Sequence, residues 1–151
     1  MDCGVPHVMI PGMGVASHLT TSVVELEEKL SGKSSIGTFL TKRVKDILAT
    51  TPPEYMMNMF RRTFLKGWDD YSEEIEKAFE TTVSADTRII WDISVIGYLM
   101  NPNWVPSFLT RTPRLTDDMR WEHDQSRHLM RIGNYIHRDL VFGDMFQRLG
   151  R

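Results

Sequence analysis

The stretch Arg88–Val105, RIIWDISVIGYLMNPNWV, decides the fold because it sets two apolar runs on either side of one carboxylate. The first run, within Thr87–Asp92 (TRIIWD), is rich in branched and aromatic residues and predicts a buried strand. The second, Ile93–Met100, is apolar on nearly every helical face, which predicts a helix packed on both sides. Asn101-Pro102 ends this helix. A strand followed at once by a helix indicates an α/β unit.

The carboxylate between the two runs belongs to Asp92. Its apolar neighbours predict that it is buried, and a buried carboxylate is costly unless it is paired, hydrogen-bonded or bound to a metal. Two roles stay open for it. Asp92 fits the N-cap of the helix from Ile93, and it also fits a metal ligand. The roles are compatible because a carboxylate has two oxygens.

The N-terminal part of the chain predicts another strand and a capped helix. Val5–Pro11 (VPHVMIP) is a short apolar run bounded by prolines, which is typical of a buried strand. Ser22 and Glu25 form a capping box at the start of a helix. That helix should end at Ser31-Gly32, because glycine accepts the left-handed conformation that helix ends prefer.

Further elements follow from hydrophobic spacing. Ile36–Leu48 repeats at helical spacing and is closed by Pro52-Pro53, and Glu54–Glu80 is helix-like but less regular. After Pro106, the chain predicts a hairpin or two short strands. In the segment from His128 to Ile136 the apolar residues fall on two faces, and the tail from Asp139 carries one apolar helical stripe: Phe142, Met145, Phe146 and Leu149.

Composition excludes several classes of partner. The 151 residues carry a formal net charge of −2, with 41% hydrophobic and 25% charged residues, so we expect no nucleic-acid partner. We expect no membrane association either, because the apolar run at Val8–Ile10 is far too short to span a bilayer. Cys3 is the only cysteine, which rules out an intrachain disulfide and favours a cytoplasmic location. Self-association into a homo-oligomer stays open.

The predicted strands are too few for a complete parallel sheet. A parallel strand needs neighbours on both sides and helices on both faces, and only two clear candidates precede Pro106. We find no internal repeat or linker. The sequence therefore predicts one α/β domain, or part of one, over residues 1–151.

Several motifs together resemble the C-terminal half of the inosine-uridine-preferring nucleoside hydrolases. The sharpest is IIWDISVIGYLMNPNWV, in which WD opens an apolar helix that ends in NP. The others come in the family's order: GVPHVMIPGMGVASHLTT, VELEEKL and GKSSIGTFL before it, and LTDDMRWEHDQSRHLMRIGNYIHRDLVFGDMF after it. The resemblance covers nearly the whole chain.

The resemblance implies a fold and an activity. The family's fold is an open, mostly parallel α/β sheet with flanking helices, of which this chain would be the C-terminal part. Its enzymes cleave the N-glycosidic bond of ribonucleosides with one tightly held Ca²⁺. The family's late calcium ligand is an aspartate at a helix start, and Asp92 matches that position. The preceding residue, Trp91, is implied to stack on a purine base, although core packing stays open for it as well.

The family's N-terminal motifs are not found in these 151 residues. One is the Asp-rich D-x-D-x-x-x-D-D segment, which supplies metal ligands and the general base, and the other is the E-F-N stretch that binds ribose hydroxyls. The resemblance therefore implies no catalytic residue in this fragment and no activity of the fragment alone. The alternative is a non-catalytic interaction module that keeps half of the fold and pairs its sheet edge with another chain.

Other candidate sites have weaker patterns. His123 and His128 lack the spacing of a zinc pair. The acidic run Asp117–Asp124 lacks the glycine and the spacing of a calcium loop, so a solvated turn is predicted. The Gly12-x-Gly14 pair has no third glycine for a phosphate loop, and His18 is predicted to order the loop before the capped helix.

Overall fold

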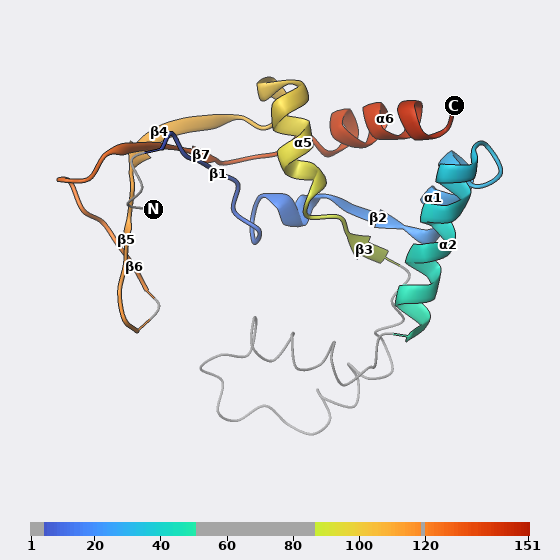
Figure 1. The fold of residues 1–151 in the computed structure, drawn as a ribbon, viewed down its shortest axis with the longest axis horizontal. Coiled ribbons are helices and arrows are strands. Elements are labelled where there is room, and N and C mark those ends of the chain that lie inside the picture. The colour runs from blue at the N-terminus through green and yellow to red at the C-terminus, as the bar shows by residue number, and fades with distance from the viewer. Residues whose placement is uncertain (1–4, 51–86, 119) are drawn as a thin grey trace. The chain divides into compact units, whose positions relative to one another are not determined.

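The computed structural model of the chain describes residues 5–50, 87–118 and 120–151 (Figure 1). The predicted helix-like segment Glu54–Glu80 lies outside the described residues. The chain divides into two compact units, one of Met1–Thr21 with Ile89–Arg148 and one of Ser22–Arg88 with Leu149–Arg151. The described part is mixed α/β, with four α-helices and small sheets.

The first unit contains a three-stranded sheet in the order β1-β7-β4. The central strand β7 (Leu129–Gly133) is parallel to β1 (Val8–Met9) and antiparallel to β4 (Ser107–Arg111). A hairpin of β5 (Arg114–Leu115) and β6 (Trp121–Glu122) extends from this sheet, as Figure 1 shows. The hairpin predicted after Pro106 is thus confirmed. A third sheet pairs β2 (Thr20–Ser22) with β3 (Thr87–Ile89).

The helices of the first unit enclose its core. They are α5 (Ile93–Met100), α6 (Arg138–Leu149) and the short 3-10 helices Ala16–His18 and Pro102–Trp104. Helices α5 and α6 pack very closely, since a β-carbon on Gly97 would come within 2.9 Å of Val141 Cγ2. The buried core cluster consists of Val15, Leu19, Val105, Ile136, Val141 and Phe142. Phe142 comes from the stripe that the sequence predicts for the tail helix.

The second unit is built on two consecutive helices, α1 (Val23–Leu30) and α2 (Ser35–Thr50). The predicted helix start is confirmed, because the Glu25 N–H donates to Ser22 Oγ over 3.1 Å. The helix end is confirmed too, with Gly32 at a φ of +73°. Between the helices, the Thr41 hydroxyl donates to the carbonyl of Leu26 over 3.3 Å.

The contact face of α2 agrees only in part with the apolar pattern, since Leu40, Val44, Ile47 and Leu48 are half-buried. Its buried residues are Gly37 and Thr41, whereas the apolar side chains of Ile36 and Phe39 are exposed. Small residues face α1 because the helices are very close here: a β-carbon on Gly37 would lie 2.6 Å from the Leu30 carbonyl oxygen.

Both strands predicted to be buried are less buried than expected. In β1, Val8 is 43% exposed, because within the described residues this strand pairs only with β7 and lies at a sheet edge. In β3, Thr87 and Arg88 are exposed and Ile89 is half-buried. The predicted burial of these strands is wrong, although both strands form within the predicted segments Val5–Pro11 and Thr87–Asp92.

Helix α5 forms where the sequence predicts it and ends at Asn101, but it is packed on one side only. Ser94 and Gly97 are buried on that side. The opposite side is an exposed apolar stripe of Val95, Ile96, Leu99 and Met100, with Leu99 73% exposed. The predicted packing on both sides is therefore wrong for the described structure. In the described residues, no helix combines the length and apolar character needed to cross a bilayer.

Candidate functional site

Trp91 and Asp92 form the turn that joins β3 to α5. The Ile90 N–H donates to the Leu19 carbonyl over 2.9 Å, which fixes the chain just before the turn. The turn then closes into the helix, as the Ser94 N–H donates to the Trp91 carbonyl over 3.1 Å. The two candidate site residues therefore follow the carboxyl end of a strand directly.

The Asp92 side chain is exposed, so its predicted burial is wrong. The apolar residues that predicted burial, such as Val95 and Ile96, are themselves exposed on the free side of α5. The predicted capping role is also wrong: Asp92 has helical angles, φ −70° and ψ −24°, and its side chain makes no cap hydrogen bond. Within the described ranges the structure gives its carboxylate no ion-pair partner either.

Trp91 lies beside a turn that follows the carboxyl end of β1. The indole is 36% exposed and does not belong to the buried core cluster, which argues against core packing as its main role. A β-carbon placed on Gly12 would lie 3.7 Å from its Cζ3 atom. The Gly12 turn is held by hydrogen bonds, one of which runs from the Ser17 N–H to the Gly12 carbonyl over 2.8 Å.

The described residues do not by themselves fit a calcium ion. Ca²⁺ takes about six to eight oxygen ligands, and high affinity needs several carboxylates or carbonyls held together. Within residues 5–50, 87–118 and 120–151, no three His, Cys, Asp or Glu side chains gather into a group that could hold a metal. Asp92 offers one carboxylate. A calcium site that includes Asp92 needs further ligands from elsewhere.

The acidic run of the β5–β6 hairpin forms hydrogen-bonded turns at the surface. Asp124 Oδ1 accepts hydrogen bonds from the Ser126 hydroxyl over 2.6 Å and from the Ser126 N–H over 2.9 Å. Asp118 pairs with Arg120, and both of these side chains are largely exposed. These contacts agree with the solvated turn that the sequence predicts.

Ser126 sets the titration of Asp124, which gives a testable pH dependence. The Ser126 hydroxyl, and then its backbone N–H, lower the pKa of the Asp124 carboxyl. Because the pKa is depressed in the folded state, the associated stabilisation is present above the ordinary carboxyl pKa and is lost as pH falls through the folded pKa. Replacing Ser126 with alanine should raise the pKa of Asp124 in an NMR titration of the side-chain carboxyl carbons.

The matched control for this titration is Ser35→Ala, at an exposed serine of α2. It should leave the Asp124 titration unchanged. An unaltered Asp124 pKa in the Ser126→Ala variant would show that the hydroxyl does not hold the carboxylate in solution.

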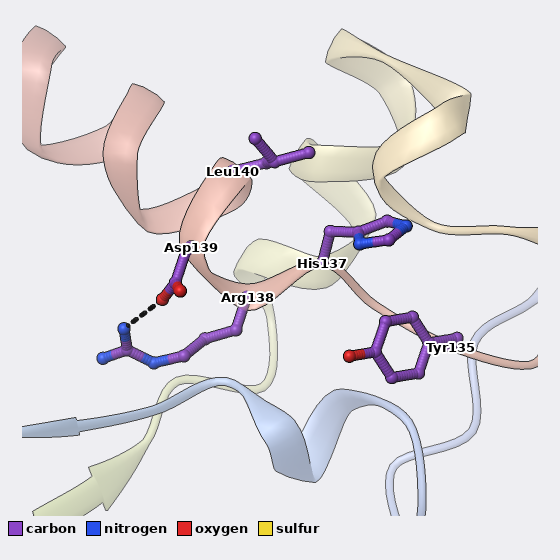
Figure 2. A pocket seen from close by; sticks show the side chains of 5 residues that line it. All are labelled: Tyr135, His137, Arg138, Asp139 and Leu140. Carbon is purple, nitrogen blue, oxygen red and sulfur yellow. Dashed lines mark hydrogen bonds and ion pairs between the residues drawn. The ribbon is translucent and has the colours of Figure 1, made fainter.

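A shallow pocket of about 180 Å³ lies at the start of α6, lined by Tyr135, His137, Arg138, Asp139 and Leu140. Figure 2 shows Arg138 turned toward Asp139, with the rings of Tyr135 and His137 near each other on the other side. The centroids of those two rings are 5.1 Å apart, and the rings are edge to face. The centroid of the His18 ring lies 5.9 Å from that of Tyr135. Sequence reasoning did not predict this group, whose only local signal is an aromatic residue two positions before a histidine.

The Arg138 guanidinium of this pocket already interacts with other groups of the protein. Arg138 Nε donates to the Thr20 carbonyl over 2.9 Å, and its Nη1 pairs with Asp139 over 2.7 Å. Its guanidinium also lies 4.5 Å from the centre of the Phe142 ring. Arg138 therefore ties α6 to the start of β2 and covers the core. It is a structural residue in this arrangement.

Comparisons with known proteins add no further assignment. No protein-family model, no curated protein and no solved structure matches the chain.

Proposed function

We propose that the chain is the C-terminal part of a nucleoside hydrolase that cleaves the N-glycosidic bond of ribonucleosides, with a preference for purines. The proposal includes the open, mostly parallel sheet of that family, of which the described β1–β7 pair would be a part. It also includes a calcium ion, bound only when the segment with the aspartate cluster is joined to this chain.

One observation carries the proposal: Trp91 and Asp92 occupy a turn in which the Asp92 carboxylate makes no hydrogen bond or ion pair with the described residues. The Asp92 carboxylate is exposed and caps nothing, and the Trp91 indole is partly exposed beside Gly12. Both turns follow the carboxyl ends of strands: β3, which pairs with β2, and β1, which pairs with β7 in a separate sheet. Open α/β sheets bind their ligands at those ends.

Within this proposal, Trp91 recognises the base. Cleavage of a ribosyl C–N bond passes through a cation-like sugar, so the departing base must accept a proton or remain a poor leaving group. An indole stacked on a purine favours its protonation, and stacking on an aromatic side chain is worth about 1–3 kcal/mol per base. A pyrimidine has a smaller ring system and gains less from the same contact.

Asp92 would supply one oxygen ligand to the calcium ion. When bound, Ca²⁺ lowers the pKa of a water molecule so that water can attack the sugar. The remaining ligands and the general base would come from the aspartate cluster, which is not part of this sequence. With one carboxylate and otherwise water, the chain gains little over the hydrated ion, so we expect weak calcium binding and no base release from the 151 residues alone.

The test compares this chain with the same chain fused to a segment that carries the D-x-D-x-x-x-D-D cluster. Calorimetry should show tight Ca²⁺ binding only in the fused protein, and a reducing-sugar assay should show inosine hydrolysis only there. In the fused protein, Asp92→Ala should lower calcium affinity at least about tenfold. Trp91→Ala should lower kcat/KM for inosine by about 5–150-fold and affect uridine less.

Exposed residues of the hairpin provide matched controls. Asp117→Ala and Trp121→Ala remove the same side-chain types from exposed positions far from the turn in sequence, and both should leave calcium affinity and base preference unchanged. Tight calcium binding or turnover by the 151-residue chain would mean that other residues form the site. An inactive fused protein that binds no calcium would overturn the proposal.

The alternative function, a non-catalytic interaction module, is favoured by two exposed features of the first unit. The apolar stripe of α5 lies open, and β1 is a sheet edge in the described structure. Both kinds of surface are typical contact sites for another polypeptide.

We expect the chain to self-associate through such surfaces. Sedimentation velocity should show concentration-dependent association, and Leu99→Glu, at the most exposed position of the α5 stripe, should reduce it. Leu115→Glu, at an exposed position of the hairpin, is the control and should have little effect. A monodisperse monomer at all concentrations would count against the interaction module.

A further inference from the structure

Gly12 lies beside the six-membered ring of the Trp91 indole. A β-carbon on Gly12 would lie 3.7 Å from Cζ3 and 3.8 Å from Cε3, and no other described atom would come within 4 Å of it. These two atoms are neighbours on the six-membered ring. Residue 12 therefore lies against one bond of the six-membered ring, and as glycine it adds no side chain over the indole.

The turn that carries Gly12 is held in place by its own hydrogen bonds. The Ala16 N–H donates to the Pro11 carbonyl over 2.9 Å, and the Ser17 N–H donates to the Gly12 carbonyl over 2.8 Å. Ser17 Oγ accepts from the Gly14 N–H over 3.0 Å, and Gly14 has a φ of +83°. The backbone beside the indole is therefore positioned independently of any side chain at residue 12.

A side chain at residue 12 would change the space beside Trp91. Alanine fits, because its β-carbon would make ordinary van der Waals contact with the ring. The further carbons of a leucine would add to this contact and cover more of the indole. Gly12 has no positive φ, so a leucine there brings no backbone strain.

We propose that Gly12 determines base specificity: its lack of a side chain keeps the exposed part of the Trp91 indole open to a planar purine. This inference rests on the proposed function and extends it from Trp91 to the neighbouring turn. A large side chain at residue 12 would compete with the stacked base. It would penalise purine nucleosides more than pyrimidine nucleosides, because the larger ring system loses more contact.

The test uses the 151-residue chain labelled with 5-fluorotryptophan, with the Trp91 signal identified in the ¹⁹F spectrum by its loss in Trp91→Phe. The change in chemical shift between H₂O and D₂O reports the exposure of the indole. Gly12→Leu should reduce this solvent shift at least twofold, and Gly12→Ala should keep most of it. Gly143→Leu is the control, since a β-carbon at this exposed position would meet no atom within 4 Å, and it should leave the Trp91 signal unchanged.

The same samples are then titrated with adenosine and with uridine at equal concentrations. In the unsubstituted chain, adenosine should shift the Trp91 signal more than uridine does, and Gly12→Leu should remove most of that difference. An unchanged solvent shift in Gly12→Leu overturns the role of Gly12, whether or not the protein is a nucleoside hydrolase. A reduced solvent shift without any adenosine response in the unsubstituted chain instead refutes base stacking on Trp91, and with it both the proposed purine preference and the role of Gly12.

Discussion

Replacing Phe142 with alanine should lower the free energy of unfolding of the first unit by about 3–5 kcal/mol. Phe142 is 1% exposed and is the largest fully buried side chain of the described core. Its ring stacks on Phe146 with centroids 5.4 Å apart, and it also lies under the guanidinium of Arg138. Alanine would leave a cavity and remove both ring contacts. Urea denaturation, with hydrogen exchange followed peptide by peptide, measures the loss.

The control is Phe39→Ala in α2, where the ring is 64% exposed. That change should alter stability by less than about 0.5 kcal/mol, because an exposed ring leaves no cavity. Faster exchange in Phe142→Ala should appear in peptides of α5, α6 and β7. Equal losses of stability in the two variants would mean that the described core is not the one that forms in solution.

Gly37→Ala should destabilise the helix pair of the second unit by about 1–3 kcal/mol, although alanine is the better helix former. The added β-carbon would lie 2.6 Å from the Leu30 carbonyl oxygen, which is a backbone atom and cannot turn aside as a side chain can. The helices would have to separate. That movement would stretch the hydrogen bond from the Thr41 hydroxyl to Leu26.

The same substitution at Gly143 should have the opposite effect on stability. Gly143 lies in α6, is exposed, and a β-carbon there would meet no atom within 4 Å. Alanine should therefore stabilise α6 by about 0.5–1 kcal/mol through helix propensity alone. Thermal unfolding of the two variants measures both effects. Destabilisation of similar size at both positions would show that the close α1–α2 contact does not exist.

Local signals in the sequence predicted the elements well. The helix cap by Ser22, the left-handed Gly32 and the end of α5 at Asn101 depend on residues within a few positions, and all three are confirmed. Which side of an element is covered depends on distant segments. The periodicity of α2 therefore identified a helix correctly but placed Ile36 and Phe39 on the wrong side, because it gave no weight to Gly37 and its close approach to Leu30.

The candidate site shows the same division between local and distant information. The sequence placed Trp91 and Asp92 at a strand-to-helix turn, which the structure confirms. It predicted burial for Asp92 from the apolar residues around it. Neighbours in sequence do not bury a side chain unless another segment covers them, and α5 is covered on one side only. The contact with Gly12 joins segments far apart in the chain, so no local pattern could have predicted it.

The pairing of β1 with β7 has a consequence for synthesis of the chain. These strands lie near opposite ends of the sequence, with Val8 opposite Arg131, whereas α1 and α2 are consecutive. Contacts between distant residues form slowly because a long loop must close first. At roughly 5–20 residues per second, a ribosome needs on the order of ten seconds to make β7 after β1 has emerged. We therefore expect the α1–α2 pair to fold on the nascent chain, while β1 stays exposed to chaperones and proteases until β7 has emerged.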